Sequence, residues 1–139
     1  MAAKGIDREA ALALVAGVEK AFGTHDVDRI MQGFTDDITG RFADQPEIHG
    51  KGAVRVFLEA RFARQKGYTL TKTNRMVDRN MIGNYWVGEW EDAFTGKRMS
   101  GRGAEFWTVR EGKVALREAA FSVWYRDAPT KPPCSLSEH

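Results

Sequence analysis

The chain has 139 residues, of which 42% are hydrophobic and 29% charged, and its formal charge at pH 7 is +2. This length fits one domain, and the composition excludes wholesale disorder. Basic and acidic residues are interspersed, so we expect neither nucleic acid nor a membrane surface as partner. No apolar run approaches the roughly 20 residues that span a bilayer, and the residues after Met1 lack a signal-peptide core, which predicts a cytoplasmic protein. The single cysteine, Cys134, excludes an intramolecular disulfide.

The first half of the chain predicts three helices. Apolar residues recur at helical spacing between Asp7, a candidate N-cap, and Gly23, a candidate helix end. Asp26 is placed to cap a short second helix. After an extended piece over 34–43, an amphipathic third helix is predicted over 51–64.

The second half predicts strands. Alternating apolar residues and two-residue turn signals define four of them, over 68–77, 81–92, 98–109 and 113–125. Helices followed by an antiparallel meander predict an α+β domain over 1–126, with three N-terminal helices packed on one face of a curved antiparallel sheet. The proline-containing segment 127–139 is predicted to be a flexible C-terminal tail.

The last predicted hairpin carries two acidic residues. A two-residue turn at Glu111-Gly112 would place Glu105 directly opposite Glu118, on the face that also carries Trp107. Carboxylates about 5 Å apart repel by roughly 3 kcal/mol at an effective dielectric near 20. We therefore expect a raised pKa for at least one of them, which suits proton transfer. The alternatives are that an arginine neutralises one carboxylate, or that a register slip turns one outward.

Tryptophans lie on the same predicted face. A two-residue turn at Thr95-Gly96 would place Trp86 opposite Glu105, with Trp90 and Trp107 nearby. Bulky indole walls next to strand glycines predict a ligand pocket, and a filled core is the alternative.

Two further residues are weaker candidates. Asp44 is either a second base or a turn residue, and His49 is either a ligand contact or a solvated loop histidine. The three histidines lack metal-ligand spacing, and no phosphate loop or dinucleotide fingerprint is present, so neither a metal nor a cofactor is predicted.

Three segments resemble nuclear-transport-factor-2-like proteins. Residues 23–37 are similar to the helix-turn-helix opening of that superfamily, 50–57 to its third-helix entry, and 105–114 to its final hairpin. The resemblance covers roughly 7–125. Glu89-Trp90 and the Glu-Phe-Trp run that begins at Glu105 resemble its SnoaL-like, ketosteroid-isomerase-like branch.

The resemblance implies a cone-shaped α+β barrel, commonly dimeric. Characterised relatives include ketosteroid isomerases, polyketide cyclases, dehydratases and epoxide hydrolases, beside members that only bind ligands. Glu105 matches a strand position where isomerases and cyclases place a functional aspartate, and Asp44 falls near the isomerase base with different spacing. Gly103 stands where limonene-type epoxide hydrolases place an arginine, which argues against epoxide hydrolysis.

These observations support two hypotheses. The first is a cofactor-independent acid–base enzyme of the isomerase, cyclase or dehydratase type, acting on a small hydrophobic cyclic or polyketide-like molecule. Glu105 would then be the acid or base, Glu118 would tune its pKa, and Asp44 would be a second base. The second is a non-catalytic ligand-binding domain, or a dimeric interaction domain. A homodimer is expected through the outer sheet face, predicted to carry Phe106 and Phe121.

Overall fold

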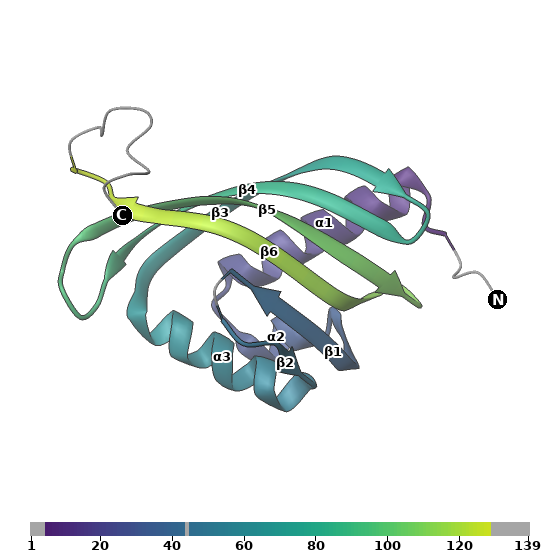
Figure 1. Cartoon of the computed structure of the whole chain (residues 1–139), viewed down its shortest axis with the longest axis horizontal. Coiled ribbons are helices and arrows are strands. Elements are labelled where there is room, and N and C mark those ends of the chain that lie inside the picture. Colours follow the sequence, from purple (N-terminus) through teal and green to yellow (C-terminus); the bar gives the residue numbers. More distant parts are fainter. Residues whose placement is uncertain (1–4, 44, 129–139) are drawn as a thin grey trace.

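Three helices and six strands make up the described part of the chain, residues 5–43 and 45–128 of a computed structural model (Figure 1). Asp44 and residues 129–139 of the predicted tail lie outside this range. The elements follow in the order α1 (Arg8–Gly23), α2 (Val27–Met31), β1 (Phe34–Phe42), β2 (Ile48–His49), α3 (Lys51–Arg64), β3 (Gln65–Asp78), β4 (Met81–Asp92), β5 (Arg98–Arg110) and β6 (Lys113–Tyr125). The α+β class and the three helices are confirmed.

Both predicted N-caps are present. The Asp7 carboxylate accepts a hydrogen bond from the Ala10 backbone N–H at 2.7 Å. The Asp26 carboxylate accepts from the backbone N–H groups of the first turn of α2. Each cap satisfies backbone donors that a helix start otherwise leaves unpaired, so these helices begin where their sequences predict.

The sheet is mixed and open. Its strands lie in the order β2-β1-β6-β5-β4-β3, and β1 runs parallel to β6 while every other pair is antiparallel. The prediction was a curved, wholly antiparallel sheet in a cone-shaped α+β barrel. The observed sheet is mixed because β1 lies parallel beside the last strand, and it is open because β2 and β3 form its two free edges. The long strands curve over the helices, with α1 against β3 and α3 near β1 (Figure 1).

A β-bulge alters the register of the last hairpin. Arg110 pairs with Lys113 and Val109 with Val114, as predicted, but the next pair is Thr108 with Leu116, so Ala115 is the extra residue. Glu105 consequently lies opposite Ala119 and not Glu118. Because side chains alternate along a strand, one inserted residue reverses the faces of everything after it. The predicted Glu105–Glu118 pair is therefore wrong.

The register of the preceding hairpin, β4 with β5, also differs from the prediction, by two residues. Trp86 lies opposite Gly103, and Asn84 lies opposite Glu105. The cause is a longer loop than predicted, in which the Asp92 carboxylate accepts from the Phe94 backbone N–H and the Thr95 hydroxyl. A two-residue shift preserves the alternation, so Trp86 stays on the inner face, as predicted.

The inner face of the sheet and the helices enclose the core. Trp107, on β5, is fully buried in it. The core also contains apolar side chains from α1, α2, α3 and the other long strands, including Val15, Phe22, Ile30, Leu58, Ile82 and Val114.

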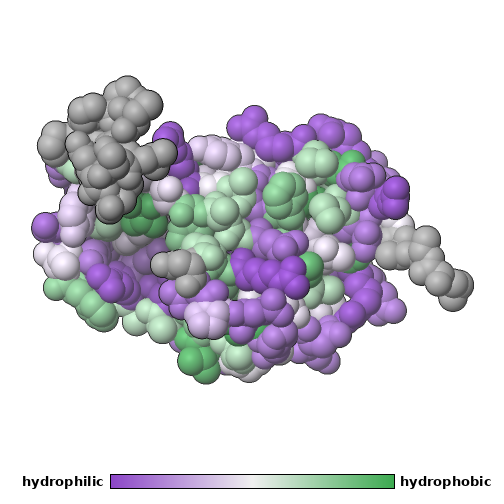
Figure 2. All heavy atoms as spheres, viewed as in Figure 1, coloured by the Kyte–Doolittle hydropathy of each residue, from purple (hydrophilic) through white to green (hydrophobic). Residues whose placement is uncertain are grey.

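The outer face of the sheet carries exposed apolar side chains. Val87, Phe106 and Trp124 are each at least 40% exposed there. Figure 2 shows apolar surface interrupted by hydrophilic side chains on one side of the molecule. Phe121, predicted for this face, instead points inward because of the bulge.

A substitution at Gly103 tests how closely β5 and β6 approach each other. A Cβ atom there would lie 2.5 Å from the Ala120 carbonyl oxygen and 2.6 Å from Phe121 Cβ. Gly103→Ala should therefore lower the free energy of unfolding in urea by about 1–3 kcal/mol. Gly17→Ala is the matched control, because its Cβ would meet nothing within 4 Å on an exposed helix position. Unchanged stability of Gly103→Ala would contradict this packing.

Candidate active site

A cavity opens between α3 and the inner face of the sheet. Its enclosed part has a volume of about 40 Å³ and its open part about 350 Å³. The two parts are adjacent, because six residues line both of them: Phe57, Arg61, Gln65, Trp90, Phe121 and Val123. The open part falls within the roughly 300–1,000 Å³ range of small-molecule sites.

Aromatic rings form most of the cavity wall. Phe42 of β1 stacks on Phe57 of α3, with 4.8 Å between ring centroids. Trp86 lies 5.7 Å from Phe121, and Tyr68 lies 5.8 Å from Trp90. Phe57 therefore lines the cavity from α3, opposite the tryptophans of the sheet. Such walls favour a flat, largely apolar ligand.

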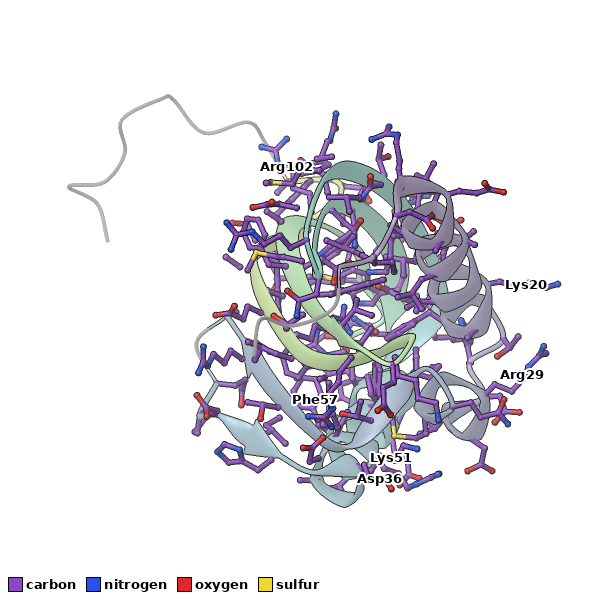
Figure 3. All side chains as sticks on the ribbon, turned by 90° about the vertical axis from the view of Figure 1, so that its right-hand side faces the viewer. Lys20, Arg29, Asp36, Lys51, Phe57 and Arg102 are labelled. Carbon is purple, nitrogen blue, oxygen red and sulfur yellow. The ribbon has the colours of Figure 1, made fainter. Side chains whose placement is uncertain are left out.

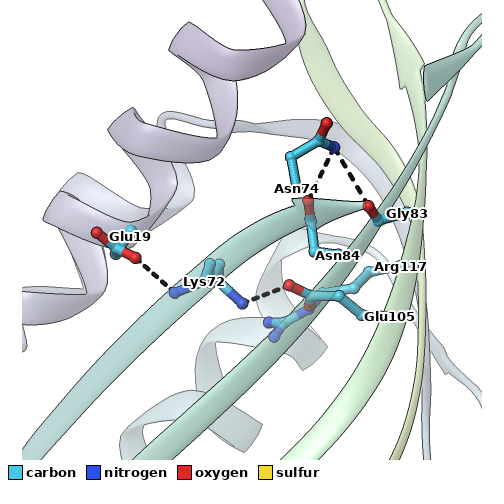
Figure 4. Close-up of polar contacts among 7 residues, drawn as sticks. All are labelled: Glu19, Lys72, Asn74, Gly83, Asn84, Glu105 and Arg117. Carbon is cyan, nitrogen blue, oxygen red and sulfur yellow. Dashed lines mark hydrogen bonds and ion pairs between the residues drawn. The ribbon is translucent and has the colours of Figure 1, made fainter. Parts of the chain in front are cut away.

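A buried ion-pair cluster lies on the inner face of the sheet (Figure 4). Lys72 Nζ of β3 donates to Glu105 Oε1 of β5 at 2.5 Å, and Arg117 Nε of β6 donates to Glu105 Oε2 at 3.0 Å. The Lys72 and Glu105 side chains are both fully buried. In contrast, Lys20 and Arg29 point away from the molecule (Figure 3). The Lys72 backbone N–H donates to the carboxylate of Glu19 on α1.

The cluster sets the protonation of its members. Burial alone would raise the pKa of Glu105, but the charges of Arg117 and Lys72 outweigh it and lower that pKa to about 2. Burial lowers the pKa of Lys72 to about 8, with a further contribution from Arg117, although Glu105 opposes both. Glu105 is therefore ionised at neutral pH. The raised carboxyl pKa expected from the sequence is not found, because two cations surround this carboxylate.

Arg117 connects the cluster to the cavity. It lines the enclosed part, and its guanidinium lies 5.2 Å from the Phe22 ring centroid and 5.3 Å from that of Phe42. The Glu105 carboxylate holds one edge of the guanidinium. Arg117 is thus a fixed cation at the inner end of an apolar hollow.

Uncharged polar groups also line the enclosed part. Burial raises the pKa of Tyr68 to about 12, so its phenol stays protonated. Trp86 Nε1 and Gln65 Oε1 are buried, and neither has a hydrogen-bond partner within the described residues. Because unpaired buried polar atoms are costly, these groups fit a ligand with polar atoms on one edge.

The comparisons with known proteins agree with this architecture. The SnoaL-like domain family matches residues 15–117. The chain belongs to the SnoaL-like family. No curated protein matches the sequence of this SnoaL-like protein.

Solved structures share its fold. One is a protein of Xanthomonas campestris assigned as a polyketide cyclase, with a TM-score of 0.73 and 21% identity over 83% of this chain and 92% of that one. SalBIII, an epoxide hydrolase/cyclase-like enzyme of pyran ring formation in salinomycin, has a TM-score of 0.76 and 16% identity over 86% of this chain and 98% of its own. TerC, crystallised with polyporic acid, has a TM-score of 0.72 and 16% identity over 81% of this chain and 92% of its own. At such identities the likeness shows the fold.

The predicted tryptophans separate into two groups. Trp86 and Trp90 line the cavity. Trp107 is fully buried in the hydrophobic core and is not among the lining residues, so two of the three predicted tryptophans form the cavity wall.

The other predicted site residues do not join the cluster. Glu118 lies on the outer face and pairs with Arg41 at 3.0 Å, because the bulge turns it outward. His49 of β2 is exposed and lies 3.2 Å from Glu47. Asp44 lies outside the described residues, and its role stays a prediction.

Three cations were not predicted for the site. Lys72 shares the strand parity of Leu70, a signal for the inner face that was available in the sequence. Arg61 falls on the apolar stripe of its helix, four residues after Phe57. In the predicted register of the last hairpin Arg117 would lie on the outer face, and only the bulge brings it inside.

The described residues contain neither a candidate metal cluster nor a candidate membrane-spanning helix. Residues 5–43 and 45–128 hold no cluster of three His, Cys, Asp or Glu side chains able to ligate a metal. No helix within those ranges has the length and hydropathy to cross a membrane.

Removal of the Glu105 charge tests the cluster. Glu105→Gln leaves Lys72 buried without its counter-ion, so the free energy of unfolding at pH 7 should fall by about 3–5 kcal/mol. The folded pKa of Glu105, about 2, lies below the unfolded value near 4.3. Its stabilisation is therefore present above that unfolded value and lost as the pH falls toward about 2.

Urea unfolding of the unmodified protein and of Glu105→Gln between pH 7 and pH 3 measures the difference between their free energies of unfolding. This difference should shrink as the pH falls. Glu118→Gln, a glutamate on the outer face, should leave stability nearly unchanged. A difference that is small at pH 7, or one that grows in acid, would contradict the assignment.

Proposed function

We propose that this SnoaL-like protein is a cofactor-independent enzyme of the isomerase, cyclase or dehydratase type. Its substrate would be a small hydrophobic cyclic or polyketide-like molecule bound in the aromatic cavity. The observation that carries the proposal is the position of Arg117, a cation fixed by buried Glu105 at the inner end of an aromatic hollow.

Arg117 is suited to stabilise negative charge on a substrate oxygen. Enolates and related intermediates develop such charge, and donors that are already oriented stabilise it without reorganising. Tyr68, whose phenol is neutral, would donate a second hydrogen bond from the cavity wall. The substrate carbonyl would then lie at the enclosed end, with its rings in the open part.

Glu105 has a different role in this proposal from the one predicted. A general acid or base works best with a pKa near the operating pH. A carboxylate with a pKa of about 2 is a weak base and holds no proton to donate at neutral pH. Glu105 is therefore a positioning residue that orients Arg117. Asp44 remains the candidate base.

Structural relatives support this class of chemistry. The names of two of them refer to cyclisation, of a polyketide and of a pyran ring. Ring formation requires a substrate held in one conformation, and a small aromatic cavity provides such restraint.

One observation favours the alternative, a domain that only binds its ligand. Among the described residues, no carboxylate lines the enclosed part of the cavity. Glu105 is held by its two ion pairs. Such a domain would use the same cavity without proton transfer.

A thermal-shift screen against cyclic ketones, enones and aromatic polyketide mimics is the first test, followed by product analysis with the compounds that bind. With a substrate identified, Arg117→Lys should lower kcat by about 100-fold or more, since the loss of one oriented oxyanion donor costs that much. Arg102→Lys, a cation on the outer face, is the matched control. Saturable binding without any product would favour the binding domain.

We also propose that the outer face of the sheet forms a homodimer. Phe106 is 42% exposed there, beside other apolar side chains. Phe106→Glu should convert a dimer to a monomer in sedimentation velocity, because it places a charge in an apolar interface. Phe94→Glu, at an exposed loop phenylalanine, should leave the dimer intact. A monomeric unmodified protein would overturn this proposal.

A further inference from the structure

Arg61 of α3 lies where the two parts of the cavity meet, since it lines both. Its guanidinium lies 4.7 Å from the Phe57 ring centroid and 5.2 Å from that of Phe121. These two rings hold the cation in place and remove much of its water. Burial, followed by the charge of Arg117, lowers the pKa of Arg61. The burial of this charge therefore has an energetic cost that no described carboxylate offsets.

Other half-buried arginines are neutralised. Arg55 contacts Asp28 at 2.7 Å, Arg117 contacts Glu105 at 3.0 Å, and Arg126 contacts Glu89 at 3.1 Å. Arg61 has no carboxylate within salt-bridge distance among residues 5–43 and 45–128. A desolvated cation without a counter-ion is unusual, and it is a feature of sites that bind anions.

The charges around the cavity also favour an anionic ligand. Arg61 and Arg117 both line its enclosed part. Asp92 borders the open part, but the Arg64 guanidinium already binds both of its carboxylate oxygens, at 3.0 and 3.1 Å. The hollow thus presents an excess of positive charge, and a bound anion would relieve the repulsion between its two arginines.

The volumes of the two parts of the cavity indicate how a ligand would lie in it. The enclosed part, about 40 Å³, is smaller than an apolar cavity of about 150 Å³ that takes up benzene. A ring system therefore fits only the open part, where Trp90, Met99 and Val123 supply apolar wall. A group at the inner edge of such a ring would lie beside Arg61.

From this arrangement we infer that the ligand is an organic anion, a cyclic or aromatic molecule whose carboxylate, or similarly acidic group, binds Arg61. The inference rests on the proposed function and narrows its substrate class from small hydrophobic cyclic molecules in general to those that carry an acidic group. It gives the two arginines separate tasks. Arg61 binds a charge that the ligand carries throughout, while Arg117 stabilises charge that develops during the reaction.

Calorimetric titration with 2-naphthoate and with neutral 2-naphthamide at neutral pH tests this inference. The two probes share a ring system and differ in charge. We expect the unmodified protein to bind the naphthoate about 10- to 100-fold more tightly, as for a charge-assisted hydrogen bond. Arg61→Gln should abolish that preference and leave naphthamide binding unchanged. Arg55→Gln, at a neutralised arginine of the same helix, should keep the preference.

Three outcomes would overturn the inference. Equal binding of the two probes would show that charge is not recognised, and the proposed function would stand. A naphthoate preference that survives in Arg61→Gln would exclude Arg61 as the anion site. Failure of both probes would refute the anion class. If the neutral ketones and enones then also failed to bind, the proposed function would fall with it.

Discussion

The ion pairs of Glu105 connect the fold to the cavity. This one carboxylate accepts from Lys72 of β3 and from Arg117 of β6, so it links strands that are not neighbours in the sheet. Because Glu105 is fully buried, its charge is tolerable only while both cations stay in place. The same contacts fix the Arg117 guanidinium at the cavity. Stability and the position of the candidate catalytic cation therefore depend on the same two contacts.

The bulge at Ala115 determines which side chains reach the cavity. Beyond it, Arg117 and Phe121 point inward, and Glu118 points outward to Arg41. With a regular hairpin the inner face would carry two carboxylates and lose its arginine. A single inserted residue thus changes the chemistry of the site from a carboxyl pair to a positively charged hollow.

The sequence predicted the elements more accurately than their register. Helix caps such as Asp7 and Asp26 act locally, through side-chain contacts to the next turn, and were therefore predictable. Strand parity placed Trp86 correctly, because a shift of two residues leaves it unchanged. The bulge depends on how β6 packs against its neighbours, and the parallel β1–β6 pair joins distant segments. Neither has a local signal, so the face of Arg117 and the partner of Glu105 could not be predicted.

The pairing of β1 with β6 has a consequence for how the chain reaches its native state. In the sheet, β1 contacts only the short β2 and the final strand β6. More than half of the described residues lie between β1 and β6 in the sequence. During synthesis on the ribosome, β1 therefore has no long partner until the last strand has emerged. Contacts of such long sequence separation form slowly. We expect the meander of β3 to β6 to assemble first, with β1 docking last, so that incomplete chains expose the edge of β1 to aggregation.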